Sequence, residues 1–130
     1  MTHIVLVIDD DEERARTAAE QVTDLDWDTD ALDVTVLHVF TDNVEGATIS
    51  QFGPAREARD VLEAAGVDVT LAETSGDPAD KIVTYAADED ADVICLSGRK
   101  RSPAGKAVFG SVSQSVMLNS DRPVLFCPPE

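Results

Sequence analysis

Apolar residues follow two alternating patterns along the chain. Five short apolar runs predict strands, at residues 4–8, 34–40, 67–72, 93–96 and 123–126. Between them, apolar residues recur at helical spacing near residues 12–22, 54–66, from 78 onward and around 112–117. Strict alternation of strand and helix predicts a parallel sheet with helices on both faces. We therefore expect one doubly wound, Rossmann-like α/β domain with five parallel strands, spanning residues 1–130.

Residues that favour helix ends support this division. The triplet Asp9-Asp10-Asp11 follows the first strand, where a carboxylate can cap a helix and face its positive end. Pro54 and the pair Asp77-Pro78 suit the first turns of the second and third helices. Gly66 is expected to end the second helix in a left-handed conformation. In the last helix, Val112, Val116 and Met117 are expected to form the apolar face.

The charge of the chain is strongly negative. It has 26 acidic and 10 basic residues, a formal net charge of -16. Self-repulsion of this size destabilises a compact state at low salt, and at molar salt the Debye length falls to about 3 Å. The charge therefore favours adaptation to a very salty cytoplasm, with an acidic surface that repels nucleic acid as the competing interpretation. Both disfavour a DNA-binding role, which needs a basic face.

Membrane insertion and secretion are not expected. No apolar run approaches the roughly 20 residues that a membrane helix needs. The first residues lack the basic-then-apolar order of a secretory signal. We expect a cytoplasmic protein.

One interval departs from the overall charge. Residues 93–120 contain no acidic residue but hold four of the ten basic ones and three glycines: Arg99, Lys100, Arg101, Lys106, Gly98, Gly105 and Gly110. Such an interval, at the end of a strand that leads into a helix, is where an open α/β sheet binds a ligand. The interval favours a phosphate site, and the alternative is a surface loop that is merely basic.

The two cysteines and the last strand bear on covalent and quaternary structure. Cys95 and Cys127 lie in apolar runs and are expected to be small core residues, although neighbouring strands would allow a disulfide. Neither His3 nor His38 stands at metal-ligand spacing from them, so no structural zinc site is expected. The last strand should lie at a sheet edge, where an apolar strand invites pairing. We therefore expect a homodimer joined there.

Three segments resemble the universal stress protein family over the whole chain. They are the strand ending in Asp9 with an Ala-rich helix behind it, the sequence Leu37-His38-Val39, and the segment 109–116 followed by Asp121-Arg122-Pro123-Val124-Leu125. The resemblance implies an adenine nucleotide alpha hydrolase-like fold, usually dimeric, linked to stress survival. Together with the acidic charge it indicates a halophilic archaeal source.

The resemblance also implies a nucleotide site. In members that bind ATP, the positions corresponding to Asp9 and Val39 contact adenine. Their phosphate loop has the pattern Gly, two residues, Gly, nine residues, Gly, then Ser or Thr. The last part is present here as Gly110-Ser111-Val112, at the start of a helix where amides favour an anion.

The chain departs from that loop pattern at two positions. Counting back from Gly110, the two earlier glycine positions are Ser97 and Lys100, with Gly98 one residue late. Lys100 and its neighbours would then replace backbone donors by charge. The expected ligand is ATP or another adenine nucleotide, with Mg²⁺ accompanying the phosphates and no metal site of the protein itself. No catalytic residue is assigned, and at most weak ATP hydrolysis is expected of a protein that acts as a sensor or regulator.

Other functions compete with this one. The family has members that do not bind ATP, so a protein-interaction module is the first alternative. The opening segment Ile8-Asp9-Asp10-Asp11-Glu12 also resembles a response-regulator receiver, but the third strand leads into Glu73-Thr74-Ser75 without the acceptor Asp. For a hydrolase, His38 is the only plausible general base, and a histidine at a strand end is more often structural.

Overall fold

The computed structural model describes residues 2–25, 28, 31–40, 49–97 and 110–127, and the backbone of residues 100–101 and 107–108. Within this part of the chain, five parallel strands form one sheet in the order β3-β2-β1-β4-β7. Their bounds are β1 Thr2–Val7, β2 Leu32–Phe40, β3 Asp68–Ser75, β4 Val93–Ser97 and β7 Val124–Cys127. The expected five-stranded parallel sheet is confirmed, with β7 at an edge.

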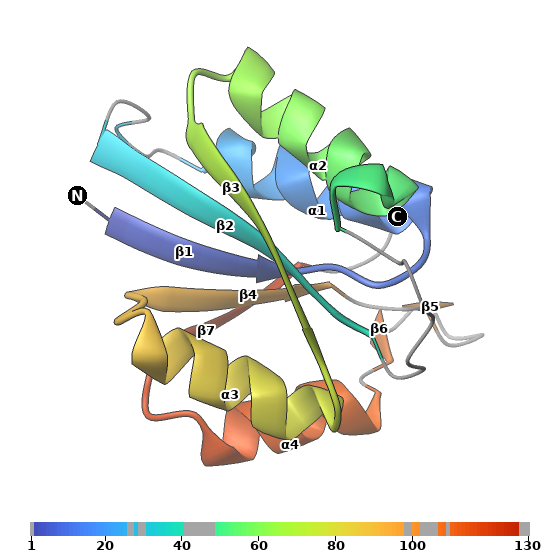
Figure 1. The fold of residues 1–130 in the computed structure, drawn as a ribbon, viewed down its shortest axis with the longest axis vertical. Coiled ribbons are helices and arrows are strands. Elements are labelled where there is room, and N and C mark those ends of the chain that lie inside the picture. The colour runs from blue at the N-terminus through green and yellow to red at the C-terminus, as the bar shows by residue number, and fades with distance from the viewer. Residues whose placement is uncertain are drawn as a thin grey trace.

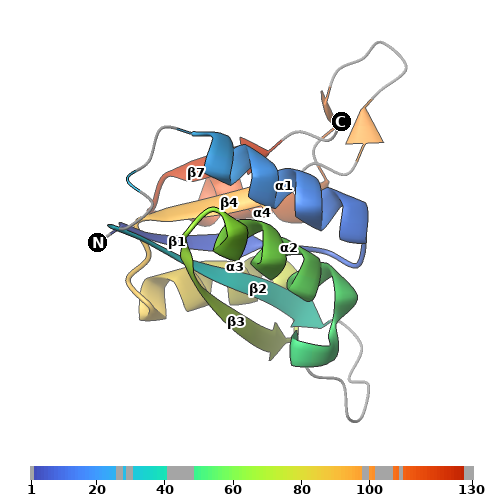
Figure 2. The same ribbon diagram turned by 90° about the horizontal axis from the view of Figure 1, so that it is seen from above.

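Helices cover both faces of this sheet. Their bounds are α1 Glu12–Asp24, the short 3-10 helix Ile49–Gln51, α2 Gly53–Ala64, α3 Pro78–Asp88 and α4 Ser111–Asn119. Figure 1 shows α1 and α2 on one side of the sheet and α3 and α4 on the other, and Figure 2 shows the same layers from above. After β3 the chain crosses to the other face of the sheet through α3 and returns as β4, which pairs with the free side of β1. The direction in which strands are added to the sheet therefore reverses between β1 and β4. Open α/β sheets bind ligands at the carboxyl ends of strands at such a point.

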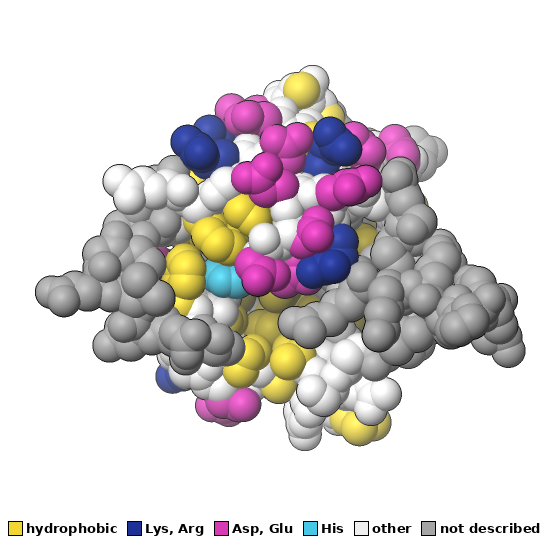
Figure 3. Space-filling model, turned by 90° about the vertical axis from the view of Figure 1, so that its right-hand side faces the viewer, with side chains coloured by type: hydrophobic (Ala, Val, Ile, Leu, Met, Phe, Trp, Pro, Cys, Tyr) yellow, Lys and Arg dark blue, Asp and Glu magenta, His cyan; other side chains and the backbone are white. Residues whose placement is uncertain are grey.

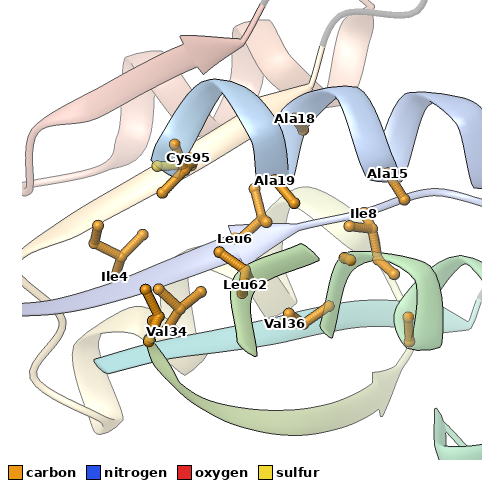
Figure 4. Close-up of a cluster of buried hydrophobic side chains, with 14 of the residues drawn as sticks. Ile4, Leu6, Ile8, Ala15, Ala18, Ala19, Val34, Val36, Leu62 and Cys95 are labelled. Atoms are coloured by element: carbon orange, nitrogen blue, oxygen red, sulfur yellow. The ribbon is translucent and has the colours of Figure 1, made fainter. Parts of the chain in front are cut away.

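Each face of the sheet has its own hydrophobic core, because successive strand side chains point to opposite faces. Along β1, Ile4 and Leu6 pack against α1 and α2, whereas Val5 packs with residues of α3 and α4. Figure 4 shows the first of these cores, where alanines of α1 allow the helix to lie close to the strands. Strands buried on both faces explain why the sequence shows continuous apolar runs rather than alternation.

The helix ends confirm the expected caps. The Asp11 carboxylate accepts a hydrogen bond from the Arg14 amide at 2.9 Å, and the Asp77 carboxylate accepts one from the Asp80 amide at 3.1 Å. Gly66 has a φ of +86° just after α2, and its amide donates to the Glu63 carbonyl at 2.9 Å. A side chain at this position would be strained, which is why the helix ends at a glycine.

Three features differ from the sequence-based expectation. Strand β3 runs to Ser75 rather than ending at 72. The apolar pattern missed its last residues because they are polar, as an edge strand allows. A two-stranded antiparallel ladder, β5 Lys100–Arg101 with β6 Ala107–Val108, forms within the basic interval and was not expected. Met117 does not belong to the buried face of α4: it is 37% exposed, because it lies one residue, or about 100°, round the helix from buried Val116.

Cys95 and Cys127 are free, buried thiols on the neighbouring strands β4 and β7. A hydrogen bond to Cys127 and burial both raise the pKa of Cys95, which keeps that thiol protonated at neutral pH. The expectation that both act as core residues is confirmed. No helix of the described chain is both long and apolar enough to span a membrane.

Candidate functional site

A cavity of about 280 Å³ opens at the carboxyl ends of the central strands. Its lining comes from five places in the chain: the end of β1, the end of β2, the first turns of α3, the end of β4 and the start of α4. Figure 3 looks onto this end of the molecule and shows a hollow with hydrophobic side chains at its base, a histidine beside it, and charged side chains along its border. The cavity thus lies where the strand order reverses, as the topology rule requires.

Six of the eight residues named from the sequence line this one cavity: Asp9, Val39, Ser97, Gly110, Ser111 and Val112. They are up to 103 positions apart in sequence, since residues 9 and 112 both contribute. Gly98 lies outside the described residues, and only the backbone of Lys100 is described, in β5. The basic part of the expected phosphate loop is therefore not placed relative to the cavity.

Val39 lines the cavity just beyond the last pair of the β1–β2 ladder, so among the described residues no strand pairs with its main chain on the β1 side. The Leu37 carbonyl accepts from the Ile8 amide at 3.0 Å, so it points toward β1, and the Phe40 carbonyl accepts from Gly76 on the β3 side at 3.3 Å. Strand geometry alternates these directions, so the N–H and C=O of Val39 also point toward β1. The β1–β2 ladder ends at the Val7–Leu37 pair. Val39 consequently offers a donor and an acceptor side by side.

The start of α4 supplies amide donors on the opposite side of the cavity. Gly110 is the N-cap and provides no side-chain cap, and the first helical backbone bond recorded there runs from Gln114 to Gly110 at 3.1 Å. The amides of Ser111, Val112 and Ser113 precede that bond and have no partner within the helix. No acidic residue occupies the first turn. This helix start therefore has the geometry and the electrostatics of an anion site.

Asp9 lies at the cavity rim, held in place by its neighbours. One carboxylate oxygen accepts from the Asp11 amide at 3.0 Å, and the other accepts from Nε of Arg14 at 3.0 Å. Arg14 also lies 3.6 Å from Asp11 and 4.0 Å from Asp10. Arg14 thus offsets part of the negative charge that three successive carboxylates place at the rim of the cavity.

Several lining residues were not predicted from the sequence to belong to the nucleotide site. Pro78 and Ile82 of α3 form apolar wall, and Asp10 and Ser113 contribute polar atoms. Nothing in their spacing marks them, because α3 reaches the cavity only through the crossover from β3 to β4. His38, weighed from the sequence as a general base or a structural residue, also lines the cavity, and its ring nitrogen Nδ1 lies 2.9 Å from the Ile8 carbonyl.

Metal binding by protein ligands finds no support in the described part of the chain. No group of three or more His, Cys, Asp or Glu side chains is placed there to hold an ion.

These features define a class: a doubly wound α/β domain with a crevice at the switch point, lined by strand ends and by the start of a helix with no acidic residue in its first turn. A sequence model of the universal stress protein family matches residues 1–128. The chain therefore belongs to the universal stress protein family, as the sequence resemblance predicted.

Two curated relatives agree with this assignment. The stress response protein NhaX of Bacillus subtilis (strain 168) is 38% identical over 69 residues, which cover 53% of this chain and 42% of NhaX. A universal stress protein of Mycolicibacterium smegmatis is 31% identical over 84 residues, which cover 62% of this chain and 65% of the relative. The matched segments thus span less than two thirds of either relative.

Solved structures share the fold across nearly the whole chain. A universal stress protein from Archaeoglobus fulgidus has a TM-score of 0.75 at 26% identity, covering 97% of this chain and 98% of its own. An A. fulgidus universal stress protein in complex with dAMP has a TM-score of 0.71 at 22% identity, covering 97% of both chains. A universal stress protein family protein from Arabidopsis thaliana with AMP bound has a TM-score of 0.73 at 16% identity, covering 100% of this chain and 93% of its own.

Proposed function

We propose that this chain binds an adenine nucleotide in the crevice at the carboxyl ends of its strands and acts as a sensor in the response to stress. One observation carries the proposal: the unpaired main chain of Val39 and the free amides at the start of α4 line the same cavity. The dAMP and AMP complexes of its structural neighbours support the same ligand class.

The base would be read by the main chain of Val39. Adenine presents an amino donor beside a ring-nitrogen acceptor on its Watson–Crick edge, which matches an adjacent C=O and N–H. Guanine presents the opposite order, a carbonyl acceptor beside an N–H donor. The apolar wall formed by Pro78 and Ile82 suits an aromatic ring. We therefore infer a preference for adenine over guanine.

The phosphates would bind at the start of α4. The amides of Ser111 to Ser113, the hydroxyl of Ser111 and the positive end of the helix favour an anion there. Ser97, Gly98 and Lys100 would complete the phosphate contacts, and Mg²⁺ would accompany a di- or triphosphate. Asp9 would approach the sugar or base from the rim, held by Arg14.

A Gly110→Val variant tests the phosphate site. Gly110 has φ −76° and ψ 167°, an extended conformation that valine also adopts, so the fold should persist. The new side chain enters the cavity that Gly110 lines. Calorimetric titration with AMP and ATP should show affinity lower by about tenfold or more, equivalent to about 1.4 kcal/mol.

Ser115→Val provides the matched control, because it adds valine to the same helix at a residue that does not line the cavity. It should bind as the unmodified protein does. Equal affinities for Gly110→Val and the unmodified protein would rule out this phosphate site.

We further infer a homodimer paired through β7, in a salt-adapted cytoplasm. Among the described strands, β7 lies at the sheet edge beside β4. The Ile94 amide donates to the Pro123 carbonyl at 3.0 Å, so by alternation the main chain of Val124 points away from β4, toward a pairing strand. The high acidic charge of the chain supports the salt-adapted setting.

A further inference from the structure

The Ile8 carbonyl has an unusual hydrogen-bond partner. In a regular parallel ladder, the bond from the Ile8 amide to the Leu37 carbonyl would be followed by one from the Val39 amide to the Ile8 carbonyl. That second bond is not among the backbone bonds of the described residues. The Ile8 carbonyl instead lies 2.9 Å from Nδ1 of His38.

The direction of this side-chain hydrogen bond is fixed by chemistry. A carbonyl oxygen can only accept, so Nδ1 of His38 carries the hydrogen and donates it. The imidazole therefore satisfies the Ile8 carbonyl, which in a regular ladder would accept from the backbone amide of Val39.

Two aromatic rings hold the imidazole in this orientation. Phe52 stacks on it, with ring centroids 4.3 Å apart and planes at 27°. Phe40 meets it edge to face, with centroids 4.6 Å apart and planes at 83°. Phe40 and Phe52 also contact each other at 5.5 Å. The His38 imidazole is thus packed between Phe40 and Phe52, with Nδ1 directed toward the Ile8 carbonyl.

We propose that His38 is a positioning residue that keeps the crevice open for the base: its donor satisfies the Ile8 carbonyl, so that the ladder does not extend to the Val39 amide. The predicted effect of His38 on nucleotide binding rests on the proposed adenine site. The presence of a His38–Ile8 hydrogen bond in place of a Val39–Ile8 ladder bond does not depend on that site. Without the imidazole donor, the shortest route to satisfy the buried Ile8 carbonyl is to extend the ladder to Val39. That extension would consume the donor needed for an adenine ring nitrogen.

Two substitutions separate the donor from the ring. His38→Asn places an amide N–H near the position of Nδ1 but removes the aromatic ring. His38→Phe keeps a ring between Phe40 and Phe52 but removes the donor. A residue that serves only as packing would tolerate phenylalanine and suffer from asparagine, whereas a positioning donor requires the reverse order.

The experiment measures AMP affinity by calorimetry and hydrogen exchange of the Val39 amide by NMR, on the full chain, with Tm recorded for each variant. We expect His38→Asn to bind AMP within about twofold of the unmodified protein and to retain fast exchange at Val39, even with a lower Tm. We expect His38→Phe to lose about tenfold in affinity, with the Val39 amide exchanging about tenfold more slowly.

The two readouts separate the possible failures. AMP binding by His38→Phe equal to that of the unmodified protein, with unchanged Val39 exchange, overturns the positioning role. So does loss of affinity in His38→Asn alone, which is the behaviour of a packing residue. If the unmodified protein binds no AMP, the adenine proposal fails, and exchange at Val39 in the two variants still decides whether His38 controls the ladder.

Discussion

At the scale of single residues, a network around Asp9 and Arg14 contributes charge beside the proposed phosphate site. The Asp9 side chain is 21% exposed and pairs with Arg14, whose side chain is 27% exposed. The sequence singled out Asp9, but it could not reveal Arg14 as its partner. The two are five positions apart, and only the turn between β1 and α1 brings them within 3.0 Å.

An Arg14→Gln substitution should weaken binding of anionic ligands. Asp9, Asp10 and Asp11 would then face the crevice rim with less compensating charge. We expect about fivefold lower affinity for AMP at low salt, equivalent to about 1 kcal/mol, and a smaller loss at molar salt because of screening. Calorimetry at two salt concentrations measures both.

Arg59→Gln is the control for Arg14→Gln. Arg59 lies on α2 with ion pairs to Asp60 and Glu63, and it does not line the cavity. It undergoes the same loss of charge, so an equal loss of affinity in both variants would show that net charge alone, rather than the Asp9 pair, controls binding.

At the scale of elements, the sequence located every strand of the main sheet and every α-helix, because parallel strands buried on both faces give uninterrupted apolar runs. It was less successful where burial is incomplete. The end of β3 carries Glu73, Thr74 and Ser75, whose alternating exposure hides the strand from a search for apolar runs. The β5–β6 ladder has two residues in each strand, too few to show any period.

The edge strand offers a test of the proposed dimer. Val124→Pro removes an N–H that points outward, while the ladder to β4 uses the alternate residues and should remain. Sedimentation or light scattering should therefore find monomers of 13.9 kDa for the variant and twice that mass for the unmodified protein. Monomers for both would refute pairing through β7, as would an unchanged dimer in the variant.

At the scale of the whole molecule, topology assembles the crevice from distant segments. Four of the lining residues come from different elements: Asp9 follows β1, Val39 is the last residue but one of β2, Ser97 ends β4 and Gly110 caps the start of α4. They meet because β1, β2 and β4 are adjacent and α4 starts at the same end. Residue spacing alone could not have grouped them, whereas the resemblance to a family named them one by one. The α3 wall was missed because neither source pointed to Pro78 or Ile82.

The net charge of -16 should make stability depend strongly on salt. Raising KCl from 0.1 to 1 M shortens the Debye length from about 10 to 3 Å and weakens repulsion among the carboxylates. We expect Tm to rise by about 10 °C, equivalent to roughly 2–3 kcal/mol for a domain of this size. Thermal unfolding followed by circular dichroism measures this. A Tm that is flat or falls over this range would contradict the salt-adapted interpretation.

NMR titration of the labelled chain with AMP in high salt tests whether one crevice reads adenine through Val39 and binds phosphate at the start of α4. We predict that the amide signals of Val39 and of Ser111, Val112 and Ser113 shift together and saturate at one AMP per chain, while GMP at equal concentration leaves the Val39 signal unmoved. Shifts confined to other parts of the chain, or none at all with either nucleotide, would contradict it.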